Sequence, residues 1–219
     1  MSANQVILAT IYDLYAAEVS KYPYACHQGC AACCTQSVTM TGLEGELLLA
    51  YLAANGRPLP ELPPGGGARP SCTTNELAAR CLARQEFEAE EQFWSFAPCL
   101  FLREKSCSIY PARPFGCRSF GSFSPCAQTG EASLAPYLVT LNTVVMQIIE
   151  HLARGGLWGN MFDVLAFLAK GRQNRPGGPA VDFSARLLTA QPLPGLLVPP
   201  DERAGLARFI ARLEAAGVL

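Results

Sequence analysis

Ten of the 219 residues are cysteine, and eight of these ten fall into two groups that together could bind a metal. The first group lies in the segment CHQGCAACC with the spacing C-x3-C-x2-C-C, and it consists of Cys26, Cys30, Cys33 and Cys34. The second group lies further along the chain, among prolines and glycines, and it consists of Cys99, Cys107, Cys117 and Cys126. A C-x2-C pair places two thiolates on one side of a tight turn, within reach of one metal ion. We therefore expect the two groups to form a metal or cluster site together.

Cys33 and Cys34 are adjacent, which restricts how the pair can bind a metal. Neighbouring side chains point to opposite faces of a strand and about 100° apart around a helix. Ordinary backbone geometry therefore disfavours binding of both sulfurs to one mononuclear tetrahedral ion. Either one of the two cysteines packs or reacts separately, or the pair serves two centres or one larger cluster. Eight sulfurs are enough for two four-thiolate sites, or for one site with additional redox-active thiols.

Other residues near the cysteines can support such a site. Concentrated thiolates leave a net negative charge even around a divalent ion, and basic residues in the outer shell can offset that charge. The second cysteine group contains four such residues, which are Arg103, Lys105, Arg113 and Arg118. His27 could replace a cysteine as a ligand, although a solvated loop histidine is the simpler expectation. Cys72 and Cys81 lie outside both groups, and we expect them to pack as small hydrophobic side chains.

Part of the second group resembles a known family signature. The residues that carry the resemblance are Cys99-Leu-Phe-Leu, Cys107-Ser-Ile-Tyr110, Arg113-Pro114 and Cys117-Arg118. They are similar to the pattern CPFL…CxIYxxRPxxCR of the YkgJ-type cysteine-cluster family, whose members also carry an upstream cysteine group that ends in CC. This chain has three residues where many members have two between the first two cysteines, and leucine replaces the usual proline after Cys99. The resemblance covers residues 26–56 and 96–126.

The resemblance implies that the chain binds iron or zinc. The family is described as a zinc- or iron-chelating domain or as an iron–sulfur protein, and Cys126 after FSP matches a variant of its pattern. Flagellin lysine methylases carry a similar cysteine arrangement, which implies that the module can be part of an enzyme. No residue of this chain beyond the cysteines has the pattern of a catalytic group, so an enzymatic role stays open.

Composition argues against several other classes of protein. The chain has 17 basic and 18 acidic residues, and this balance is unlike that of a nucleic-acid binder or a polybasic membrane patch. Its most apolar stretch, PYLVTLNTVVMQIIEHL, is interrupted by Asn142, Gln147 and Glu150 and is too polar for a bilayer span. The N-terminal segment predicts an amphipathic helix and not a signal peptide. We therefore expect a cytoplasmic protein, in which thiols stay reduced.

Helical periodicity and capping signals predict a mainly α fold, a helical domain with two irregular cysteine-rich loops that form the site. Helices are expected at about 4–21, 41–56, 74–94, 135–153, 159–170 and 200–217. Within the second of these, Thr41 and Glu44 have the spacing of a capping box. We expect residues 1–130 to form the cysteine-cluster metal-binding region and residues 131–219 a helical region packed on it, within one compact domain.

Three functional hypotheses follow from these patterns. The leading one is a cysteine-ligated metal protein, an iron–sulfur protein with a redox or modification role and an unknown protein or redox partner. The alternative is a zinc-binding structural or interaction module without catalysis. A secreted disulfide-bonded protein is the third, and the predicted N-terminal helix disfavours it.

Overall fold

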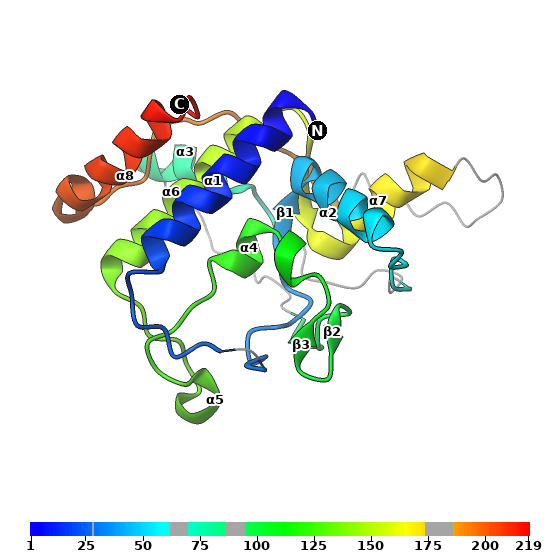
Figure 1. The fold of residues 1–219 in the computed structure, drawn as a ribbon. Helices are drawn as coiled ribbons and strands as arrows, with labels where there is room; N and C mark the ends of the chain where they lie inside the picture. The colour runs from blue at the N-terminus through cyan, green and yellow to red at the C-terminus, as the bar shows by residue number, and fades with distance from the viewer. Residues whose placement is uncertain (28, 62–69, 86–94, 174–185) are drawn as a thin grey trace.

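The chain is mainly helical, as the sequence predicts, and its described residues also form a three-stranded sheet and a two-stranded hairpin (Figure 1). The structure is a computed structural model, and it describes all residues except 28, 62–69, 86–94 and 174–185. The helices are α1 (Ala3–Val19), α2 (Gly42–Ala54), α3 (Thr74–Leu82), α4 (Phe115–Arg118), α5 (Cys126–Thr129), α6 (Pro136–Leu152), α7 (Met161–Gln173) and α8 (Arg203–Ala215). The strands are β1 (Thr39–Thr41), β2 (Leu102–Arg103), β3 (Ser106–Cys107), β4 (Leu157–Asn160) and β5 (Leu187–Thr189), and two short 3-10 turns cover Tyr110–Ala112 and Pro200–Glu202.

Capping boxes begin the first two helices. At α1, the Ser2 hydroxyl accepts a hydrogen bond from the Gln5 amide at 3.3 Å, and the Gln5 side chain accepts one from the Ser2 amide at 2.9 Å. At α2, the predicted box is confirmed, since Thr41 Oγ1 accepts from the Glu44 amide at 3.2 Å and Glu44 Oε2 accepts from the Thr41 amide at 2.8 Å. Each box satisfies two backbone donors that a helix start leaves without a partner.

The first hydrophobic core joins α1, α6 and α8. Its buried side chains include Leu8 and Ile11 of α1, Leu141 of α6 and Phe209 of α8. Helix α6 lies inside this core, which accounts for its apolar sequence. Within the described part of the chain, no helix is both long enough and apolar enough to cross a membrane.

The second core lies between α2, α7 and a three-stranded antiparallel sheet of order β1-β4-β5. Met40 of β1 pairs with Gly159 of β4, and Trp158 of β4 pairs with Leu188 of β5. Cys99, Cys107 and Cys117 also pack against this core. The sheet and the cysteine-bearing segments therefore pack against the same core.

Two predicted helices have different limits in the structure. Helix α3 ends at Leu82, because the chain turns at Ala83 and Arg84 adopts a left-handed φ of 54°. The prediction that this helix continues beyond Leu82 is therefore wrong for residues 83–85. Residues 86–94 of that prediction lie outside the described residues. The helix predicted at 159–170 begins at Met161, because Gly159 and Asn160 belong to β4.

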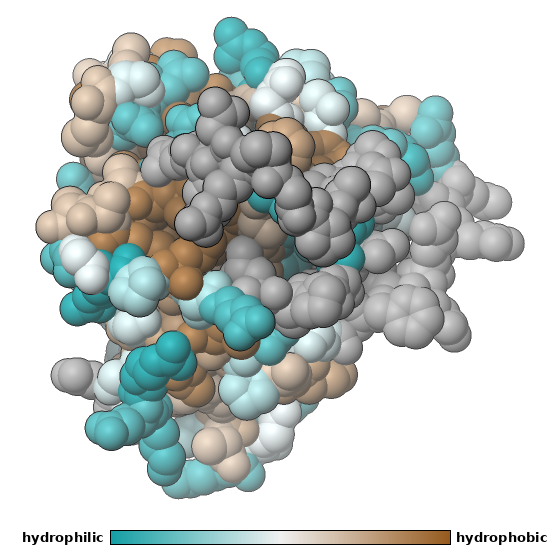
Figure 2. Space-filling model, turned by 90° about the vertical axis from the view of Figure 1, so that its right-hand side faces the viewer, coloured by the Kyte–Doolittle hydropathy of each residue, from teal (hydrophilic) through white to brown (hydrophobic). Residues whose placement is uncertain are grey.

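The three helices of the first core and the cysteine segments occupy different ends of the molecule. In Figure 1, α1, α6 and α8 lie toward one end with both termini, while α5 and the β2–β3 hairpin lie at the other end. Residues 96–130, predicted to lack a helical pattern, contain this hairpin and two helices of one turn each. The space-filling view in Figure 2 shows hydrophobic residues gathered on one face, with hydrophilic residues around them.

Candidate metal centre

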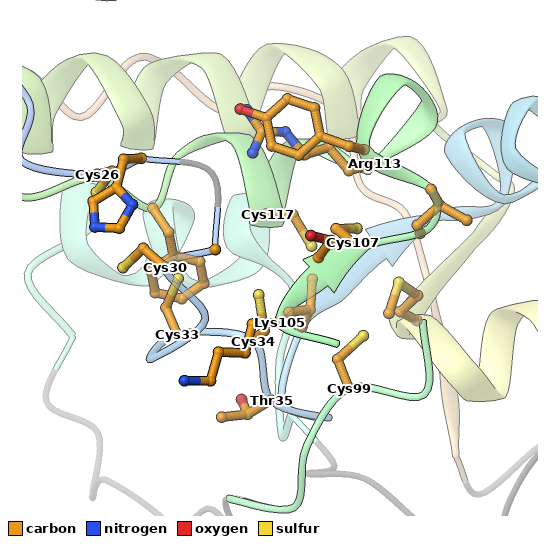
Figure 3. Close-up of a pocket in the computed structure, with 18 residues that line it drawn as sticks. Cys26, Cys30, Cys33, Cys34, Thr35, Cys99, Lys105, Cys107, Arg113 and Cys117 are labelled. Atoms are coloured by element: carbon orange, nitrogen blue, oxygen red, sulfur yellow. The ribbon is translucent and has the colours of Figure 1, made fainter. Parts of the chain in front are cut away.

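A cavity of about 560 Å³ lies where the two cysteine segments meet (Figure 3). Seven of the eight predicted ligands line it, namely Cys26, Cys30, Cys33, Cys34, Cys99, Cys107 and Cys117. Cys126 does not line it and lies at the start of α5. The structure thus brings together cysteines that are far apart in the sequence.

The first cysteine segment is folded by a series of tight backbone turns. The Cys30 amide donates to the His27 carbonyl and the Cys34 amide donates to the Ala31 carbonyl, both at 3.0 Å. At its end, the Cys34 carbonyl accepts from the Cys99 amide at 2.9 Å, which joins the first segment directly to the second. His27 also lines the cavity beside these turns.

The β2–β3 hairpin positions Cys107. Cys107 lies opposite Leu102 in the ladder, and the Leu102 amide donates to the Cys99 carbonyl at 3.0 Å. The two residues between the strands, Glu104 and Lys105, have φ of 46° and 62°. Positive φ at both central residues is the geometry of a two-residue hairpin turn, and here it directs Lys105 to the cavity.

Helix α4 positions Cys117, and a buried carboxylate fixes the start of this helix. Glu44 Oε1 accepts hydrogen bonds from the Phe115 amide at 2.7 Å and from the Tyr12 hydroxyl at 2.8 Å. A side chain at Gly116 would place its Cβ 2.9 Å from the Thr39 carbonyl oxygen, so only glycine allows α4 to lie this close to β1. The sequence pattern predicts Glu44 only as a capping residue, because its contacts with α1 and α4 are long-range.

The basic residues of the second segment differ in their roles. Arg118 donates from Nε to the Arg113 carbonyl at 2.9 Å and from Nη2 to the Pro111 carbonyl at 2.8 Å, so it shapes the loop. Arg113 lines the cavity with its guanidinium 3.9 Å from the centre of the Tyr110 ring, and among the described residues its buried Nε has no hydrogen-bond partner. Arg103 is exposed and does not line the cavity, so Arg113 and Lys105 are the predicted basic residues that lie beside the thiols.

Hydrogen bonding and burial control the protonation of the thiols. The hydrogen bond between the two adjacent thiols lowers the pKa of Cys34 below its ordinary value and raises the pKa of Cys33 far above it. Burial raises the pKa of Cys26, Cys99 and Cys117. Of these five thiols, Cys34 therefore loses its proton most readily, and metal binding to the others would release protons.

The donor set suits a metal that prefers sulfur. The described residues that line the cavity include seven cysteines and one histidine but no aspartate or glutamate. Soft thiolate ligands select zinc and iron–sulfur clusters over magnesium or calcium. Within the described part of the chain, however, no three cysteine, histidine, aspartate or glutamate side chains are arranged to hold one ion. Binding would therefore require the thiols to move toward one another.

The remaining two cysteines lie elsewhere. Cys72 precedes α3 and is half-buried, whereas Cys81 within α3 is exposed. The expectation that Cys81 packs inside the protein is therefore wrong, because α3 buries its other face through Asn75 and Ala78. No disulfide bond joins cysteines in the part of the chain that the structure describes.

No protein-family model matches this chain, and neither a curated protein nor a solved structure shows significant similarity to it. Its function has to be inferred from the residues around the cavity.

Proposed function

We propose that this protein binds a thiolate-ligated metal centre between its two cysteine segments, and that the centre is of the iron–sulfur type. The observation that carries this proposal is the lining of one cavity by seven cysteines from distant parts of the chain. Membership of the YkgJ-type family, inferred from the motifs around Cys107 and Cys117, is part of the same proposal.

The chemistry of the cavity favours a polynuclear centre. Iron–sulfur clusters are held by cysteine thiolates, usually four for each cluster. The cavity offers more thiols than one mononuclear tetrahedral ion can use, and two of them are adjacent. Lys105 and Arg113 supply positive charge beside the thiols, which offsets the negative charge of a thiolate-ligated cluster.

Such a centre would supply one-electron redox chemistry or support a modification reaction. Cys26 and Cys33 are exposed, so a partner protein could approach this side of the centre. The proposed compartment is the cytoplasm, where the thiols would stay reduced and available for metal.

A zinc-binding structural module is the second candidate. Cys107 lies on β3 and Cys117 on α4, and Cys34 belongs to a third segment. A structural ion bound by thiolates from all three would tie these elements together and add to the hydrogen bonds that join them.

Metal and sulfide analysis tests the proposal. The full chain is purified without oxygen, and iron, zinc and acid-labile sulfide are measured for each chain. Matched amounts of iron and sulfide would support the cluster, and zinc without sulfide would support the structural module instead. Absence of both metals would overturn both candidates.

Two cysteine variants make this test specific. Cys30→Ser should hold less metal than the wild type, because Cys30 lines the cavity, whereas Cys72→Ser should keep the wild-type amount, because Cys72 does not. Equal metal content in the two variants would remove Cys30 from the ligands.

A further inference from the structure

Four of the eight cysteines gather on the wall of the second hydrophobic core. Cys99, Cys107 and Cys117 pack against that core, and Cys34 is joined to Cys99 by a backbone hydrogen bond of 2.9 Å. All four of these cysteines line the cavity. We call Cys34, Cys99, Cys107 and Cys117 the inner quartet.

A second set forms around Cys26. The Ala25 amide donates to the Ser122 carbonyl at 2.8 Å, which brings the first segment beside the chain that leads to α5. The buried Ser122 hydroxyl accepts from the Ser124 amide at 3.2 Å and from the Ser133 amide at 2.9 Å, and this folds the α5 segment back. These hydrogen bonds tie the segment that carries Cys126 to the segment that carries Cys26, although Cys126 does not line the cavity.

The members of this second set come from the two segments that the Ala25–Ser122 hydrogen bond joins. Cys26, Cys30 and Cys33 line the cavity from the first segment, and Cys126 begins α5 on the second. We call Cys26, Cys30, Cys33 and Cys126 the outer quartet. It belongs to irregular loops and to one short helix, and two of its members are exposed.

The adjacent pair Cys33–Cys34 marks the boundary between the quartets. Cys34 follows Cys33 in the chain, but its carbonyl accepts the hydrogen bond from the Cys99 amide of the second segment. Figure 3 shows Cys26, Cys30 and Cys33 on one side of the cavity, Cys99, Cys107 and Cys117 on the other, and Cys34 between them.

We propose that the protein holds two separate metal centres, one in each quartet, on either side of the Cys33–Cys34 peptide. Four thiolates complete either a tetrahedral zinc site or the ligand set of one cluster. This inference rests on the proposed metal function and extends it, since it assigns all eight cysteines. The outer centre is the more exposed one and faces solvent or a partner, while the inner centre is supported by the core.

Paired substitutions test this division. One variant carries Cys99→Ala and Cys107→Ala, a second carries Cys26→Ala and Cys126→Ala, and a third combines all four changes. The exposed Cys81→Ala is the control. All are purified as full chains without oxygen, iron, zinc and sulfide are measured, and circular dichroism checks the helices.

Two centres predict that each paired variant keeps about half of the wild-type metal, because each loses one four-ligand site. The four-fold variant should keep none, and Cys81→Ala should keep all. Loss of all metal from the outer-pair variant, or full retention in it, would overturn the division. If the inner-pair variant fails to fold, the outer-pair variant decides alone, because its substitutions lie on loops and α5.

The experiment distinguishes failure of the proposed metal function from failure of the two-centre inference. A wild-type protein without metal would contradict the proposed function itself. A wild-type protein that binds metal, and whose outer-pair variant loses all of it, would contradict only the second centre.

Discussion

Glu44 is the residue that links the cysteine site to the helical core. One oxygen of its buried carboxylate accepts from Tyr12 of α1 and from the Phe115 amide of α4, at 2.8 and 2.7 Å. The other accepts from the Thr41 amide and hydroxyl, at 2.8 and 3.0 Å. A buried acceptor with several donors costs stability when it is removed, because each donor is left without a partner.

Replacement of Glu44 by glutamine should therefore destabilise the protein by about 2 kcal/mol. The side-chain NH2 group of glutamine would take the place of a carboxylate oxygen and face the hydrogen-bond donors from which that oxygen now accepts. Urea unfolding of the full chain measures the loss. Glu46→Gln is the matched control, because Glu46 is exposed on the same helix and should change stability little. Equal stability of the two variants would show that Glu44 does not hold α4 in place.

At the scale of elements, the contact between α4 and β1 determines where Cys117 lies. A Cβ at Gly116 would meet both the Thr39 carbonyl oxygen and a methyl group of Val38 at 2.9 Å. Neither neighbour is the flexible end of a long side chain. An added methyl group must therefore push α4 away from the strand.

Gly116→Ala should destabilise the protein by about 1–3 kcal/mol and lower its metal content, because overpacking shifts Cys117. Gly171→Ala is the matched control, since an added Cβ on this exposed position of α7 meets nothing within 4 Å. The control should instead stabilise by up to about 1 kcal/mol, through helix propensity. Thermal unfolding measures the stability of both variants, and metal analysis measures their metal content. A change of stability in the same direction in both variants would show that close packing at Gly116 does not hold α4 against β1.

Helices were easier to predict than strands because their signals are local. The Thr41–Glu44 box and the apolar spacing of α1 identify their helices without reference to the rest of the chain. Strands β1 and β5 have three residues each and exist because β4 pairs with both, which no local pattern reveals. Helix α3 was predicted too long because good helix formers continue beyond Leu82, where the chain turns.

At the scale of the whole molecule, the cavity lies between segments that depend on one another. The number of cysteines in the two groups predicts that Cys26 to Cys34 lie near Cys99 to Cys117, because reactive residue types are visible in a sequence, and the structure places them around one cavity. The hydrogen bond between Cys99 and Cys34 and the support from Glu44 were not predictable, because both depend on tertiary contacts. The position of Cys126 outside the cavity lining depends in the same way on the fold around Ser122.

Removal of the metal should loosen the β2–β3 hairpin and leave the helical core intact. Metal that binds only the folded state stabilises it, and here it would hold Cys107 against the first segment. Trypsin should cut at the exposed Arg103 and Lys105 several-fold faster after chelation under reducing conditions. Cleavage at Arg203 in α8 is the internal control, and an equal change at both places would contradict local loosening.

The most direct test of the central claim is X-ray absorption at the edge of the metal that co-purifies with the full chain. The account predicts a first shell made of sulfur alone, at about 2.3 Å if the metal is zinc, and an additional metal–metal shell if it is clustered iron. A first shell of nitrogen or oxygen at about 2.0–2.1 Å, or a protein without metal, would contradict it.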